Sequence, residues 1–261
     1  MTDDSRLLRA RLEELSQSVA DLEQLSERQT RFVALAAHEL RAPAAVIDGI
    51  AATLASRADE LGPEQRSMLH SLLHEQTSRI VRLMDQLLDL SRLDGRAVRI
   101  ERSRIAVRER VEALVGSVAG ERADDVVVEV DVGLEALVDP EALDRILANL
   151  VTNALRYGEA PVRVRAEQAD RHLRLTVEDE GAGVPDDFRP QLFERFSRAQ
   201  GTTSTETGAG LGLAIAEQYA LAHGGRIVYE QRAPHGARFR VVLPATPVEA
   251  AAEAAPSGIP G

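Results

Sequence analysis

The first fifth of the chain carries apolar residues at steps that alternate between four and three positions. The series runs through Leu8, Leu12, Leu15, Val19, Leu22, Ser26, Gln29, Val33, Ala36, Leu40, Pro43, Ile47, Ile50 and Leu54. This heptad spacing places one stripe along a helix, as in a coiled coil or a helical bundle, with a polar spot at Ser26 and Gln29. An isolated helix would leave so long a stripe exposed, so the spacing predicts a helical partner.

A second helix with the same spacing follows at once. Gly62 and Pro63, in "DELGPEQ", stop one helix and start another. From Pro63 to about Asp94 the spacing resumes at Leu69, Leu73, Gln76, Ile80, Leu83, Leu87 and Leu90. Two helices joined by a short turn form an antiparallel hairpin. One hairpin leaves its stripes half covered, and two hairpins complete a four-helix bundle, so we expect a homodimer.

Charge and composition exclude several classes of protein. The 261 residues carry a formal net charge of -11, which argues against a general nucleic-acid binder because that role needs a basic face. Without cysteine the chain has no disulfide and no thiolate metal site. The apolar runs fall short of the roughly 18 residues of a membrane span, and the N-terminus lacks a signal-peptide pattern. We therefore expect a soluble, cytoplasmic protein.

The second half of the chain mixes short strands with helices. The expected strands are 126–130, 162–166, 173–178, 226–229 and 237–243, and the expected helices are 140–157 and 211–223. This mixture predicts an α+β layer of helices on a largely antiparallel sheet. Residues 246–261 are rich in Ala, Pro and Glu and are expected to be a disordered tail.

The expected first helix contains a histidine, His38, in the stretch "LAAHELRAP". If Val33 takes heptad position a, His38 falls at position f, which points away from the bundle, so we do not expect it in the core. A zinc site of the HExxH type would need a second histidine where Ala42 stands. From the spacing alone, a solvated surface histidine and an exposed reactive one both remain open. Pro43 follows closely and usually kinks a helix.

Asparagine and glycine patterns in the second half indicate a nucleotide site. Asn149 and Asn153 lie four residues apart and so share a helix face, and paired amide oxygens suit Mg²⁺. In "VEDEGAGVP" a strand runs into Asp179, which could accept a hydrogen bond from an exocyclic amine, and the following glycines allow a tight turn. In "TGAGLGLAI" a glycine-rich loop leads into a helix, which is a typical phosphate site. Each pattern alone is also compatible with ordinary surface polarity or a simple turn.

Taken together, these blocks resemble the cytoplasmic core of the sensor histidine kinases of two-component signalling, over roughly residues 29–244. "HELRAP" resembles the phospho-acceptor block, "NLVTNALRYG" the N block, "DEGAG" the first glycine block, "LFERFSR" the phenylalanine block and "GAGLGLAI" the second glycine block. The resemblance implies a dimeric helical hairpin followed by a two-layer α/β ATP-binding sandwich. It implies a signalling helix at 1–28, a dimerisation and phosphotransfer domain at 29–95 and an ATP-binding domain at 96–245.

The resemblance also assigns roles to residues. It makes His38 the phospho-acceptor and Glu39 the acid that helps to deprotonate it, with ATP as phosphoryl donor. Asn149 and Asn153 would hold Mg²⁺, and Asp179 would read the adenine amine. The remaining residues implied at the nucleotide are Arg156 and Tyr157 near phosphates and adenine, Gly181 and Gly183 at the base, Phe193 and Phe196 as lid anchors, and Gly208, Gly210, Leu211 and Gly212 in the phosphate lid.

The resemblance implies partners as well: a second copy of the chain, and a response regulator whose aspartate takes the phosphoryl group from His38. The input signal would come from an upstream sensor domain or from a separate sensor protein. One position departs from the family pattern. Many relatives have Thr or Asn four residues after the histidine, where it helps to place a water that dephosphorylates the regulator. This chain has Ala42, so we expect a weak regulator phosphatase.

Two other functions compete with that of a histidine kinase. An ATPase of the gyrase and chaperone type would need a catalytic glutamate near the first asparagine, whereas Leu150, Val151 and Thr152 separate the two asparagines here. A catalytically dead dimeric scaffold would have no need of intact glycine and asparagine blocks. The sequence therefore favours the kinase.

Overall fold

The computed structural model describes residues 3–57, 60–94, 99–199 and 209–245, in two compact units that divide between Leu87 and Leu88. The expected tail at 246–261 lies outside the described residues. Among the residues described, no helix has both the length and the apolar character that a membrane crossing requires.

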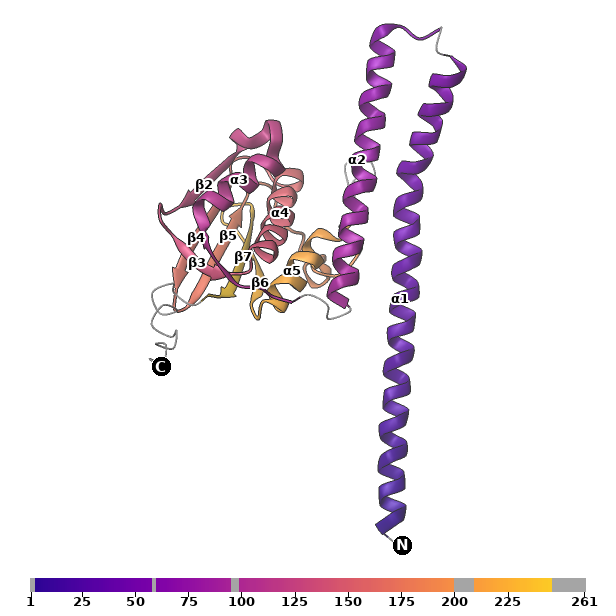
Figure 1. Cartoon of the computed structure of the whole chain (residues 1–261), viewed down its shortest axis with the longest axis vertical. Coiled ribbons are helices and arrows are strands. Elements are labelled where there is room, and N and C mark those ends of the chain that lie inside the picture. The colour runs from indigo at the N-terminus through magenta and orange to yellow at the C-terminus, as the bar shows by residue number, and fades with distance from the viewer. Residues whose placement is uncertain (1–2, 58–59, 95–98, 200–208, 246–261) are drawn as a thin grey trace, which may run out of the picture. The chain divides into compact units, whose positions relative to one another are not determined.

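The first unit is a helical hairpin, as expected from the heptad spacing. Helix α1 spans Asp3–Ser56 and helix α2 spans Pro63–Asp94, and Figure 1 shows them running in opposite directions from their connection. The backbone N–H of Gly62 donates to Oε1 of Gln65 at 3.0 Å and so marks the start of α2. Helix α1 continues through Pro43, which is buried.

Several heptad positions of the hairpin are buried. Ala36 and Ile50 of α1 and Leu83 of α2 are buried, whereas positions off the series, such as Val46 and Val81, are exposed. Leu15, Val19 and Val33 belong to the same series but are exposed on the single hairpin, so the spacing predicted only part of the inward faces.

The second unit is a two-layer sandwich of helices on a sheet. Its elements in chain order are β1 (Ser103–Ala106), α3 (Val107–Ala119), a 3-10 turn (Gly120–Asp125), β2 (Val126–Val130), β3 (Glu135–Val138), α4 (Pro140–Tyr157), β4 (Val162–Ala169), β5 (His172–Glu178), a 3-10 turn (Arg189–Gln191), α5 (Gly212–Ala222), β6 (Arg226–Gln231) and β7 (Ala237–Pro244). The main sheet has the order β2-β4-β5-β7-β6, and β1 pairs with β3 in a small second sheet.

The sheet is largely antiparallel, as predicted. Only the β2–β4 pair of the main sheet is parallel. Helices α3, α4 and α5 pack on one face of this sheet (Figure 1). Inward-facing residues alternate with outward-facing ones along β4, β5 and β7, so the core lies between sheet and helices. Its large, fully buried side chains include Leu143, Ile146, Leu147 and Leu150 of α4, Leu173 and Leu175 of β5, Ile215 of α5 and Leu243 of β7.

Three elements were not expected from the sequence: α3, β1 and β3. Helix α3 buries Val107, Val111, Val115 and Ala119 on one face, but valine is β-branched and does not favour a helix strongly. Strands β1 and β3 have four residues each, too few for a clear alternation of apolar and polar residues.

Candidate functional site

His38 lies on α1 with its side chain exposed, which agrees with its heptad position f. The following Glu39 is half-buried, and Ala42, one turn further along the helix, is exposed. Ala36 and Pro43 on either side are buried. The helix thus presents the imidazole to solvent, where an external reactant can reach it.

Helix α4 carries both asparagines. Asp139 caps its N-terminus by accepting from the N–H of Ala142 at 2.9 Å, and Pro140 occupies the first helical position. Asn149 and Asn153 are both half-buried, one turn apart on this helix. The amide nitrogen of Asn149 donates to the carbonyl of Arg145 at 2.7 Å, which leaves Oδ1 as the atom available to a ligand.

The start of α5 lies against this oxygen. A Cβ built on Gly212 would stand 2.9 Å from Oδ1 of Asn149, so a side chain at position 212 would cover it. An amide oxygen is a hard ligand that suits Mg²⁺, and the lack of a side chain at 212 leaves room beside it. The residues present therefore fit a magnesium ion that retains part of its water.

Asp179 follows the last residue of β5 and is 5% exposed. Its Oδ1 accepts from the backbone N–H of Gly181 at 2.9 Å and of Ala237 at 3.2 Å. Burial raises the pKa of the Asp179 carboxyl, and the two backbone N–H groups oppose this rise. Because both donors hold Oδ1, the carboxylate has a defined orientation before any ligand binds.

Gly158 joins the asparagine helix to Asp179. It follows Tyr157 at the end of α4, and a Cβ built on it would stand 2.4 Å from both Cβ and Cγ of Asp179. A Cβ on Gly181 would in turn stand 2.8 Å from Cα of Gly158. Arg156 and Tyr157, predicted near the nucleotide, are exposed beside this junction. The structure thus brings the N block and the first glycine block together.

Position 183 requires glycine for a different reason from position 158. Its φ of +78° lies in the left-handed region, and a Cβ there would stand 2.3 Å from Nε2 of Gln231. Gln231 itself donates to the carbonyl of Gly236 at 3.0 Å. The turn after Asp179 is therefore packed against the β6–β7 hairpin.

The phenylalanine block and the second glycine block meet through their backbones. The N–H of Phe196 donates to the carbonyl of Gly210 at 2.9 Å, and a Cβ on Gly210 would stand 2.6 Å from the carbonyl oxygen of Ser197. Phe193 packs edge-to-face on Phe239 of β7 with ring centroids 6.5 Å apart. Leu211 is buried ahead of α5. Gly208 and residues 200–207 lie outside the described residues.

The contacts of Gly158, Gln231 and Gly236 were not anticipated from the sequence. Gly158 ends the motif "NLVTNALRYG", so its position beside the N block was visible, but its contact with Asp179 was not. Gln231 contacts Gly183 and Gly236 contacts Asp179 from a hairpin some fifty residues later in the chain, and no local pattern signals these contacts.

Comparisons with known proteins agree with this architecture. The family model described as "His Kinase A (phospho-acceptor) domain" matches residues 28–96, and the one described as "Histidine kinase-, DNA gyrase B-, and HSP90-like ATPase" matches residues 138–247. Together the two matches cover more than half of the chain. The first contains His38, and the second contains Asn149, Asp179 and Gly212. The chain belongs to the sensor histidine kinases.

Curated sensor histidine kinases match nearly the whole chain. The signal transduction histidine-protein kinase AfsQ2 of Streptomyces coelicolor is 33% identical over 95% of this chain and 48% of its own length. Sensor histidine kinase MtrB of Mycobacterium tuberculosis is 32% identical over 89% of this chain and 42% of its own length. The chain thus spans about half the length of these relatives.

Solved histidine kinases share the fold. Acinetobacter baumannii histidine kinase AdeS superposes with a TM-score of 0.64 at 24% identity, over 79% of this chain and 97% of that chain. Full-length ShkA, solved in complex with AMPPNP, superposes with a TM-score of 0.59 at 25% identity, over 81% of this chain and 45% of that chain. This kinase core thus has the fold expected from its motifs, a helical hairpin followed by an ATP-binding sandwich.

Proposed function

We propose that this kinase core phosphorylates itself on His38 with ATP and then passes the phosphoryl group to an aspartate of a response regulator. The observation that carries the proposal is the junction at Gly158, where the asparagine helix α4 meets the buried, oriented carboxylate of Asp179. Such a junction suits a ligand with an adenine amine at one end and phosphates at the other. ShkA, solved with AMPPNP, supports an adenine nucleotide as the ligand.

The nucleotide would lie along this junction. Asp179 would accept a hydrogen bond from the adenine amine, with Gly181 and Gly183 beside the base and Arg156 and Tyr157 at its rim. Gly208, Gly210, Leu211 and Gly212 would enclose the phosphates, with Phe193 and Phe196 anchoring that segment. Asn149 and Asn153 would hold Mg²⁺, which supplies charge neutralisation to the phosphates when bound.

His38 supplies the nucleophile. In the neutral imidazole one ring nitrogen carries a free electron pair, and this nitrogen is the nucleophile. This nitrogen forms a bond to the γ-phosphorus while the bond from that phosphorus to the bridging oxygen breaks, and ADP leaves with the electron pair. The ring proton passes to Glu39 or to water. In the second reaction the aspartate oxygen of the regulator displaces the imidazole from phosphorus.

We further propose that residues 29–95 form the dimerisation and phosphotransfer domain, with residues 1–28 as the signalling helix and 96–245 as the ATP-binding domain. Val46 of α1 and Val81 and Met84 of α2 are exposed on the single hairpin. Exposed apolar side chains on paired helices favour a second copy of the hairpin as partner. ATP as donor places these domains in the cytoplasm.

Ala42 bears on the hydrolysis of the phosphorylated regulator by water. Its methyl group cannot hold a water molecule by a hydrogen bond, so we propose that this kinase is a weak phosphatase of its regulator. The side chain is exposed and stands one turn from His38, where a regulator that reaches His38 would meet it.

Labelling with ATP that carries a radioactive γ-phosphate tests the proposed function. We expect label on the protein that is lost in acid and kept in base, and no label on the variant His38→Ala. Free phosphate without labelled protein would instead indicate an ATPase of the gyrase type. Neither product would indicate a scaffold, and both of these results contradict the proposal.

A further inference from the structure

The loop between β6 and β7 contacts the backbone at Asp179. The N–H of Asp179 donates to the carbonyl of Ala237 at 3.0 Å, and Nδ1 of His235 lies 2.8 Å from the carbonyl oxygen of Glu180. A Cβ on Gly236, which has a φ of +114°, would stand 2.2 Å from the carbonyl oxygen of Asp179. The loop therefore packs directly on the residues at the end of β5.

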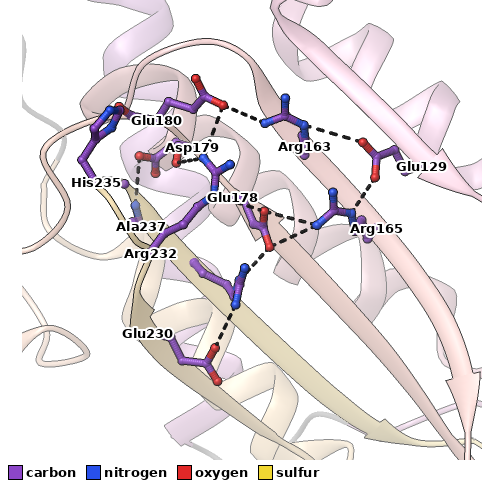
Figure 2. Close-up of polar contacts among 12 residues, drawn as sticks. Glu129, Arg163, Arg165, Glu178, Asp179, Glu180, Glu230, Arg232, His235 and Ala237 are labelled. Carbon is purple, nitrogen blue, oxygen red and sulfur yellow. Dashed lines mark hydrogen bonds and ion pairs between the residues drawn. The ribbon is translucent and has the colours of Figure 1, made fainter.

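Arg232 begins this loop and reaches three consecutive residues. Its Nη1 donates to the carbonyl of Asp179 and to Oε1 of Glu180, both at 3.4 Å. Its Nε lies 3.6 Å from Oε2 of Glu178. Figure 2 shows the guanidinium next to Asp179 and Glu180. One rigid guanidinium thus spans both flanks and the backbone of the residue proposed to read adenine.

The two glutamates that Arg232 contacts are fixed by further arginines. Glu178 is 3% exposed and also pairs with Arg238 of β7 at 2.6 Å and with Arg165 of β4 at 3.3 Å. Glu180 pairs with Arg163 of β4 at 2.8 Å. Figure 2 shows Glu180 with Arg163, and Glu178 with Arg165, near Asp179. Arg232 therefore ties the Asp179 backbone to ion pairs that cross strands of the sheet, so a shift of Asp179 would disturb several of them at once.

The positive charge of Arg232 also affects the protonation of Asp179. Burial raises the pKa of Asp179, Glu159 adds to this rise, and the positive charge of Arg232 opposes it. Asp179 can accept two more hydrogen bonds only as a carboxylate, so a nearby cation favours the form that binds an amine.

We propose that Arg232 is a positioning residue for base recognition, which holds Asp179 in place to accept a hydrogen bond from the adenine amine. The guanidinium reaches Asp179 through its backbone carbonyl and acts on the nucleotide only through that residue. The proposal rests on the proposed binding of ATP, and it names a residue on which the preference of Asp179 for adenine depends.

Binding of ATP and of inosine triphosphate to the full chain separates this role from general support of the fold. Inosine triphosphate has a carbonyl oxygen where ATP has the amine, so it faces the Asp179 carboxylate with an acceptor. Wild type is expected to prefer ATP by about tenfold or more, since a hydrogen bond to a charged group contributes that much. In Arg232→Gln the affinity for ATP should fall far enough to remove most of the preference for ATP over inosine triphosphate. The affinity for inosine triphosphate should stay within about twofold of the wild-type value.

Two further variants control the experiment. Arg232→Lys keeps the positive charge but cannot span three partners, so an intermediate preference is expected, and it serves in place of Arg232→Gln if that variant does not fold. Arg240→Gln removes another ion-paired arginine, whose Nη1 lies 2.9 Å from Oε1 of Glu230, and should keep the full preference for ATP.

Three results would overturn the proposal. If Arg232→Gln keeps the wild-type preference, Arg232 does not position Asp179. If it loses both nucleotides equally, its role is only structural. If wild type itself shows no preference for ATP, base recognition by Asp179 is wrong, and the proposal for Arg232 fails with it.

Discussion

Gly158 and Asp179 are in such close contact that no side chain fits between them: a Cβ at position 158 would stand 2.4 Å from Cγ of Asp179. Gly158 directly follows the helix that carries Asn149 and Asn153, and Asp179 directly follows strand β5. The contact therefore sets how the proposed magnesium ligands and the proposed adenine acceptor lie relative to each other.

Substitution Gly158→Ala should weaken ATP binding. The new methyl group would meet Asp179 and also the carbonyl oxygen of Ala154 at 2.7 Å, so the carboxylate must shift. Overpacking of this kind costs about 1–3 kcal/mol, and we expect ATP affinity to fall roughly tenfold or more. Titration calorimetry measures the loss of ATP affinity, and thermal unfolding measures the loss of stability.

Gly116→Ala is the matched control. Gly116 lies within α3, where a Cβ would meet nothing within 4 Å. Replacing a helical glycine by alanine should raise the free energy of unfolding by about 0.4–1 kcal/mol and leave ATP binding unchanged. If Gly158→Ala leaves ATP affinity unchanged, as Gly116→Ala should, the close contact with Asp179 is not needed for ATP binding.

Asp179→Asn should stabilise the nucleotide-free protein at pH 7 while it impairs ATP binding. Burial raises the pKa of Asp179 above its usual 3.8, so between the two pKa values the folded protein binds more protons than the unfolded chain. The free energy of unfolding therefore falls as pH rises through this interval, and the charged carboxylate reduces stability at pH 7.

The difference between Asp179→Asn and wild type should accordingly shrink as pH falls through the raised pKa of Asp179 toward its usual value. Urea unfolding of both proteins across this pH range provides the comparison. A variant that is less stable than wild type at pH 7 would contradict this account of the carboxylate.

His223 should make stability depend on pH in the opposite sense. It is 1% exposed, and its Nε2 accepts from the N–H of Asp139, which caps α4, at 3.1 Å. Burial lowers the pKa of His223 below its usual 6.5, and the charge of Arg102 lowers it further. Below pH 6.5 His223 is protonated in the unfolded chain but not in the folded protein. The contribution of His223 to the free energy of unfolding is therefore full above pH 6.5 and declines below it.

His223→Gln tests this contribution, because glutamine cannot titrate yet can still accept from Asp139. The decline in the free energy of unfolding between about pH 7 and pH 5 should be smaller in the variant than in wild type. Equal declines in the two proteins would show that His223 contributes nothing to it.

Ala42→Thr should give the kinase phosphatase activity. A hydroxyl one turn from His38 can hold a water molecule near the regulator, and we expect dephosphorylation of the phospho-regulator to rise about tenfold or more. Its decay with ADP present measures this rate. Ala44→Thr, also exposed but on another side of the helix, should have no effect. Rapid decay with the wild-type kinase would contradict the proposal.

The sequence predicted the strongly patterned elements well. Helix α4 was expected at 140–157 and has those bounds, because a regular apolar face lies between Pro140 at its start and Gly158 at its end. Helix α3 was missed because its buried face consists largely of valine, and β1 and β3 were missed because they are short.

At the candidate site, residues within one motif could be named in advance, but contacts between motifs could not. Arg232 and Gly236 contact Asp179 because β7 pairs with both β5 and β6. That pairing is decided by the packing of the whole sheet, and nothing near Arg232 in the sequence signals a neighbour fifty residues earlier.

The site of phosphorylation is the most direct test of the account. His70 and His74 are exposed on α2 of the same hairpin and serve as internal controls for an accessible imidazole. After incubation with ATP and Mg²⁺, mass spectrometry under alkaline conditions should find phosphohistidine at His38 and at neither of the other two. A phosphoryl group on His70 or His74, or none on His38, would contradict the account.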